Sequence, residues 1–172
     1  MSDLKFNREN SNLGGIAEFK FIFERQLVQD IEIIKGQVVS MISTAPFIIP
    51  DLTFNSSSFK ETPKGINLFE YEFKGVVAQD DLDKLYDSIR TDTNKIIAIV
   101  KDNNNQSRLL GQNGNACLME LSFDKGKDVA DLNKIELNLV WKSKERAAFA
   151  NNVYIIPAMY QFEDGEFYNF ND

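Results

Sequence analysis

An aromatic residue stands at every second position in the run Phe69-Glu70-Tyr71-Glu72-Phe73-Lys74-Gly75, and charged residues separate the aromatic ones. Successive side chains of a β-strand point to opposite faces, so this run predicts a strand with one packed face and one wet face. The same alternation recurs at Phe19, Phe21 and Phe23. Because the chain has 14 Phe in 172 residues, many of them in such positions, we expect a mainly β fold.

Shorter apolar runs mark the remaining strands. Two of them flank Gly36, which predicts a bend between them, and residues 102–105 are Asp-Asn-Asn-Asn, a sequence that favours a hairpin turn. The predicted strands cover residues 31–34, 38–42, 108–111, 117–123, 135–141 and 153–156. Between them, residues 44–65 hold Pro46, Pro50 and Pro63 and predict a long loop with at most a short edge strand.

A single helix is predicted at residues 80–90. Asp80 and Asp81 suit a helix N-terminus, and apolar residues follow at helical spacing. The next run, residues 96–100, is continuously apolar, so we expect a strand buried on both faces beneath that helix. The predicted fold class is therefore mainly β, a β-sandwich or half-barrel with one flanking amphipathic helix.

The chain divides into three parts in this interpretation. Residues 1–13 are polar and predict a flexible N-terminal arm, residues 14–150 form the β domain, and residues 151–172 supply a last strand and an aromatic, acidic tail. The length suits one domain. We expect no signal peptide and no membrane-spanning segment, and the single cysteine argues against a disulfide framework, so synthesis in a cytoplasm is predicted.

Charge and composition argue against several function classes. The net charge of −7 disfavours a direct grip on nucleic acid phosphates, which depends on clustered Lys and Arg. The chain has no His, so the commonest general base and metal ligand is missing. We therefore predict that the protein is not an enzyme, and we assign no catalytic, cofactor-binding or metal residues.

Three sets of residues resemble parts of active or binding sites but have simpler interpretations. Cys117 alternates with apolar residues and is expected to be a buried, inert thiol. Gly111 and Gly114 do not lead from a strand into a helix, so they predict a turn and not a phosphate loop. Residues 56–58 are three serines without a base to activate them, which favours a loop.

The connection between residues 124 and 133 leaves one alternative open. Asp124, Asp128, Asp131 and Asn133 offer oxygen ligands that Ca²⁺ accepts, but their spacing matches no EF-hand loop. A solvated hairpin loop is the favoured interpretation. Whether this loop binds a cation is not decided by its sequence.

Three segments together resemble a known group of proteins. They are Gly14-Gly15-Ile16, the run from Arg108 to Gly114 (Arg-Leu-Leu-Gly-Gln-Asn-Gly), and Asp131-Leu132-Asn133-Lys134 opening the strand that ends at Trp141. The ensemble resembles small virion proteins from the tail and neck of tailed phages that infect Bacteroidota. The predicted order of elements from Phe69 to Trp141 is also similar to the phage tail tube fold, a β-sandwich with one flanking helix.

That resemblance implies a structural role in a virion. Copies would form a ring, sixfold or higher, in which strands of neighbours complete a barrel around the passage for DNA. DNA would be passing cargo, and an acidic lumen would repel its phosphates. Such rings would stack or join neighbouring tail or neck proteins, and residues 44–65 and the N-terminal arm would form the contacts between rings.

The alternative function is a ligand- or glycan-binding β-sandwich module at the tail tip. Such a module needs exposed aromatic side chains. Trp141 is in register with the apolar face of its strand, so only Phe167, Tyr168 and Phe170 remain as candidates.

Overall fold

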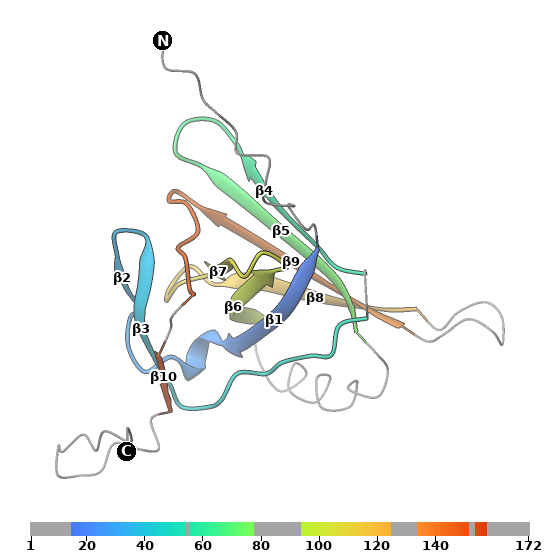
Figure 1. Ribbon diagram of the computed structural model, residues 1–172, viewed down its shortest axis with the longest axis horizontal. Coiled ribbons are helices and arrows are strands. Elements are labelled where there is room, and N and C mark those ends of the chain that lie inside the picture. The colour runs from blue at the N-terminus through green and yellow to red at the C-terminus, as the bar shows by residue number, and fades with distance from the viewer. Residues whose placement is uncertain (1–14, 54–55, 78–93, 125–133, 152–153, 158–172) are drawn as a thin grey trace.

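A computed structural model describes residues 15–53, 56–77, 94–124, 134–151 and 154–157, and within these ranges the protein is mainly β, as predicted (Figure 1). The largest unit is a seven-stranded sheet. Its strands are β1 (Ile16–Phe23), β4 (Ser58–Pro63), β5 (Phe69–Val77), β6 (Lys95–Asp102), β7 (Ser107–Leu110), β8 (Cys117–Asp124) and β9 (Lys134–Ser143). A smaller sheet contains β2 (Glu32–Ile34), β3 (Gln37–Ser43) and β10 (Tyr154–Pro157), and a short 3₁₀ turn, η1 (Glu24–Gln26), follows β1.

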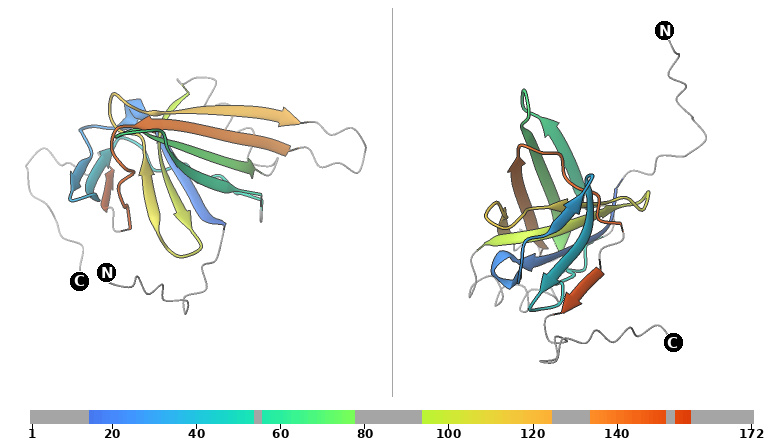
Figure 2. Two further views of the ribbon diagram at one scale, coloured as in Figure 1. Left: turned by 90° about the horizontal axis from the view of Figure 1, so that it is seen from above. Right: turned by 90° about the vertical axis from the view of Figure 1, so that its left-hand side faces the viewer.

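The large sheet curls into a half-barrel (Figure 2). Its strands follow the order β1-β6-β8-β9-β5-β4, and β7 pairs with β6 away from this path. Three strands separate β1 from β5 in that order, yet the Phe19 and Phe73 rings stack with their centroids 4.4 Å apart. Such contact requires a strong curl, so the half-barrel is the predicted alternative that the structure shows.

The alternating aromatic residues fill the inside of the half-barrel. Phe19, Phe21, Tyr71 and Phe73 are at most 1% exposed, and Trp141 of β9 stacks on Tyr71 with a centroid separation of 5.2 Å. Aromatic pairs of this kind contribute beyond the area that they bury. The period-2 pattern of the sequence therefore corresponds directly to the packed face of the sheet.

Strand β6 is buried on both faces, as its continuous apolar run predicted. The prediction placed a helix over its second face, whereas the described residues that cover this face include those of the small sheet. Among the described residues, Ile97 and Ile99 on its second face pack with Val38 and Met41 of the small sheet. Ile22, Leu109 and buried alanines complete this second cluster. Residues 80–90, where the flanking helix was predicted, lie outside the described residues.

Residues 147–150 join the two sheets. On one side, Leu109 N donates to Ala148 O at 2.9 Å and Ala150 N donates to Ser107 O at 2.9 Å. On the other side, Phe149 N donates to Gly36 O and Val38 N donates to Phe149 O, both at 2.8 Å. This segment, which we call the junction, is therefore hydrogen-bonded to β7 and to the start of β3 at once.

Side chains fix the junction from both ends. Ala147 N donates to the buried hydroxyl of Tyr71 at 2.7 Å, and Arg108 donates to Ala147 O at 3.0 Å. The Arg108 guanidinium also lies 3.7 Å from the centroid of the Phe149 ring. Burial raises the pKa of Tyr71, which keeps its hydroxyl neutral.

The described part of residues 44–65 is a loop with one short edge strand, as predicted. The allowed edge strand is β4, which pairs antiparallel with β5 from Ser58 to Pro63. Residues 47–53 cross the open side of the half-barrel, bridging Phe21 through Ile48 and Val77 through Leu52. The N-terminal arm, residues 1–13, lies outside the described residues.

In the part of the chain that the structure describes, no helix is long and apolar enough to cross a membrane.

Tyr71→Phe should lower the free energy of unfolding by about 1–3 kcal/mol, because it leaves the buried N–H of Ala147 without an acceptor while keeping the ring stack. Chemical denaturation monitored by Trp141 fluorescence measures the change. Ser56→Ala, which removes an exposed hydroxyl bonded to Thr53 O, is the matched control and should shift the value by less than about 0.5 kcal/mol. Equal effects of the two substitutions would contradict the role given to Tyr71.

Candidate functional site

The thiol of Cys117 lies inside the half-barrel. The residue is 0% exposed on β8, and burial raises the pKa of the thiol well above its ordinary value. A thiol that is neutral and shielded is a poor nucleophile. The structure thus places Cys117 in the core, where the sequence predicted it.

Gly111 and Gly114 lie in a tight turn between β7 and β8. Gln112 and Asn115 exchange backbone hydrogen bonds across it at 3.1 and 3.0 Å, and Gly114 N donates to the Glu24 carboxylate at 2.8 Å. Trp141 Nε1 donates to Asn115 O at 2.9 Å and ties the turn to β9. The turn is satisfied by protein groups, in agreement with the interpretation as turn chemistry.

The structure describes all three serines of residues 56–58, but only Asp124 of the acidic loop. Ser56 donates its hydroxyl to Thr53 O at 2.6 Å, and Ser58 begins β4. Residues 125–133 lie outside the described residues, so Asp128, Asp131 and Asn133 cannot be placed beside Asp124. Among the residues that are described, no group of three or more His, Cys, Asp or Glu side chains could hold a metal ion.

Of the four aromatic residues considered for glycan binding, the structure describes Trp141 alone. Trp141 is 3% exposed and packs inside the half-barrel, so it offers no platform to a sugar. Phe167, Tyr168 and Phe170 lie outside the described residues. The exposed large hydrophobic side chains of the described part are all aliphatic.

What the sequence did not predict is an open groove beside β1. The edge strand β1 pairs with β6 on one side, and on its other side Phe21 exchanges two backbone hydrogen bonds with Ile48, at 3.0 and 2.8 Å. Within the described residues, no strand or bridge pairs with that outer side from Ile16 to Lys20. A hollow of about 510 Å³ lies there, bounded by residues 15–19 of the β1 side and by residues 49–53 with Ser57.

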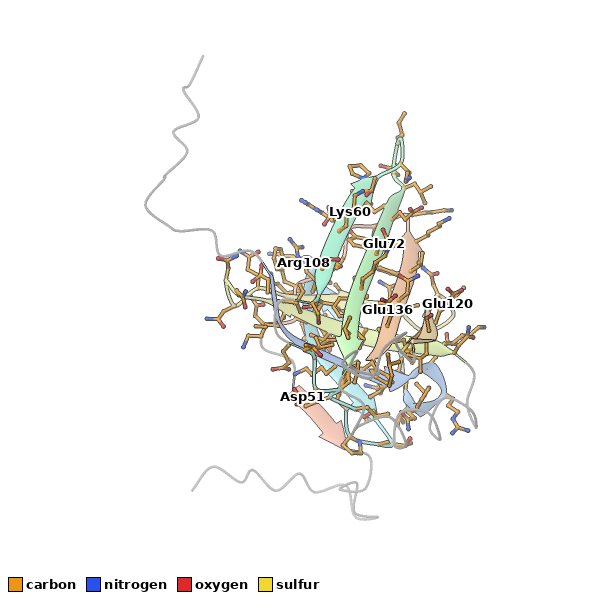
Figure 3. The ribbon with its side chains drawn as sticks, turned by 90° about the vertical axis from the view of Figure 1, so that its right-hand side faces the viewer. Asp51, Lys60, Glu72, Arg108, Glu120 and Glu136 are labelled. Carbon is orange, nitrogen blue, oxygen red and sulfur yellow. The ribbon has the colours of Figure 1, made fainter. Side chains whose placement is uncertain are left out.

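The groove combines apolar walls with two carboxylates. Ile16, Phe19 and Leu52 line it together with Ile49, which is 61% exposed. Glu18 and Asp51 contribute the acidic groups, and Glu18 also pairs with Lys20 at 3.1 Å (Figure 3 labels Asp51). At its end, Gly15 has φ +102° and approaches the Asn103 side chain so closely that a Cβ would lie 2.8 Å from it. An unpaired strand edge with apolar neighbours is suited to binding an extended chain.

The outer face of the half-barrel carries balanced charge. Lys60 lies opposite Glu72 in the register of β4 and β5, and Glu72 also contacts Lys74 at 2.9 Å (Figure 3). Lys142 of β9 reaches Glu70 at 3.6 Å. These charged side chains of β4, β5 and β9 therefore form pairs of opposite charge.

Comparison with family models, curated proteins and solved structures finds no match to this chain.

Cys117 should remain unmodified when the folded protein is treated with a thiol reagent, and should react fully after unfolding, because its side chain is buried and its pKa is raised. Absorbance of the released reagent group measures the reaction. Leu118→Cys, at a neighbouring position that is 51% exposed, is the control and should react at once. Rapid labelling of the native protein would show that the thiol is accessible after all.

Gly111→Ala should destabilise the protein more than Gly114→Ala. Both glycines have positive φ, which costs about 1–2 kcal/mol for alanine, but only at Gly111 would the new Cβ meet backbone, 3.0 Å from Ile96 O. Crowding of this kind adds about 1–3 kcal/mol. Thermal denaturation of the two variants compares them, and equal losses would be inconsistent with the close packing of this turn.

Proposed function

We propose that this protein is a structural component that assembles with copies of itself into a ring in the tail or neck of a tailed phage. The observation that carries the proposal is the open half-barrel, whose sheet ends in two different edge strands, β1 and β4. Unpaired edges are templates for pairing with another chain. Two unlike edges on one body favour a head-to-tail contact, which closes into a ring when the rotation between neighbours is suitable.

The distribution of charge is compatible with close packing of copies. The described residues contain as many acidic as basic side chains, thirteen of each. The whole net charge of −7 comes from residues 78–93 and 158–172. The other segments that the structure does not describe contain equal numbers of acidic and basic residues. A neutral body does not repel its own copies, whereas a high net charge does.

The same distribution of charge restricts which residues could make the lumen acidic. In this proposal, charge that repels passing DNA would come from residues 78–93 or 158–172 and not from the half-barrel, whose outer face is balanced. The placement in a virion, with tail or neck proteins as neighbours and DNA as cargo, rests on the sequence resemblance. The protein would be made in the host cytoplasm before assembly, without a membrane partner.

A glycan-binding module at the tail tip is the weaker alternative. Sugar sites are commonly built on exposed aromatic rings, but among the described residues the exposed large hydrophobic side chains are aliphatic, and Trp141 is buried. The groove beside β1 is lined by aliphatic side chains and a buried Phe19. This alternative depends on Phe167, Tyr168 and Phe170 alone.

The native mass of the purified protein, measured by light scattering across a concentration series, should rise to a multiple of the 19.6 kDa chain. Negative-stain images of the largest species should then show rings with a central hole. A monomer at every concentration would contradict self-assembly by this protein alone. In that case a glycan-binding screen tests the tail-tip alternative.

A further inference from the structure

The groove beside β1 has the dimensions and chemistry of a site for one extended chain. Its free edge runs from Ile16 to Phe19, which spans roughly 13 Å at about 3.3 Å per residue. Residues 49–53 form the opposite wall, and the two walls meet where Ile48 bridges Phe21. The occupant should present apolar side chains to Ile49 and Leu52, and positive charge on it is compatible with Asp51 and with Glu18, which also pairs with Lys20.

The N-terminal arm has a sequence that meets these requirements. Leu4 and Phe6 are two positions apart and would face the same side of a strand, while Lys5 and Arg8 supply two positive charges. These five residues span about 16 Å when extended, enough to cover the free edge. The arm joins the fold at Gly15, which itself lines the groove, so the arm begins at the site in every copy.

We propose that residues 4–8 of one copy bind as an added strand in the β1 groove of a second copy. The proposal rests on the proposed self-assembly and names the contact that would carry it. The arm of the same chain competes for the groove, because Asn10, Asn12 and Gly14 allow a turn within residues 9–14 that would lay it along its own β1. An exchanged arm satisfies the free edge of β1 and links neighbours in a head-to-tail order.

Disulfide trapping between two full-length variants tests this contact. Asn7→Cys carries the thiol on the arm and keeps Lys5 and Arg8, and Ala17→Cys carries it at an exposed position of the β1 edge. One variant has an affinity tag, so that a disulfide between different copies is distinguished by mass on a non-reducing gel. Cys117 does not compete, because it is 0% exposed.

The control replaces the arm thiol with Ile66→Cys at the tip of the β4–β5 hairpin, where the side chain is 95% exposed. If collisions alone form the bond, this control should react with Ala17→Cys at least as well as the arm does. We expect the arm variant to give at least a fivefold higher yield of the mixed dimer. Equal yields would overturn the proposal. A higher yield from Ile66→Cys would also overturn it and would indicate that the β4–β5 hairpin occupies the groove.

Two further measurements separate the possible failures. A double variant with Asn7→Cys and Ala17→Cys in one chain should form intermolecular disulfides, and closure within the monomer alone would overturn the exchange in favour of the chain's own arm. The native mass of each variant is measured under reducing conditions. Rings that persist while the arm gives no excess of mixed dimer would refute the arm contact and leave self-assembly standing, whereas monomers without a trapped dimer would refute both.

Discussion

Four residues, Ala147 to Ala150, connect the two sheets through a backbone that is hydrogen-bonded on both sides. The junction pairs with β7 on one side and with the start of β3 on the other. Three of the four residues are alanine and buried, and small side chains allow a backbone to pass between two packed layers. Without this segment, the small sheet would lose its direct tie to β7, and Ile97 and Ile99 would lose part of their cover. Tyr71 and Arg108 hold the junction in place, so the aromatic core and the sheet connection form one unit.

Much of the half-barrel could be predicted from the sequence because its strands are one-sided. Alternation at Phe69, Tyr71 and Phe73 reports directly which face is packed, and the apolar run of β6 reports burial on both faces. The Asn-rich turn and Gly36 marked chain reversals for a local, conformational reason. What covers the second face of β6 could not be predicted, since the small sheet depends on pairing between segments distant in sequence. The position of the junction is equally hidden, because a run of alanines carries no periodic signal.

The candidate groove shows the same limit. Its two walls come from residues 15–19 and 49–53, and neither segment has a motif that indicates a site. Only the curl of the sheet brings them together, with Ile48 bridging Phe21 at one end. In contrast, Cys117 and the turn at Gly111 could be judged from sequence alone, because burial of a strand position and turn geometry are local properties. The balance of charge lies between these cases: the counts are in the sequence, but their meaning requires knowing which residues build the sheets.

The parallel pairing of β10 with β3 has a consequence for how the chain is made. Tyr154 lies beside Ser40, and Phe149 lies beside Gln37, so residues synthesised early wait for partners synthesised late. Domains begin to fold while translation proceeds at about 5–20 residues per second. A nascent chain that has completed β1 to β9 still lacks a neighbour along one side of β3, and pairing between distant segments is slow. The small sheet can therefore close only after β10 has been synthesised, and until then β3 presents an unpaired edge to other nascent copies.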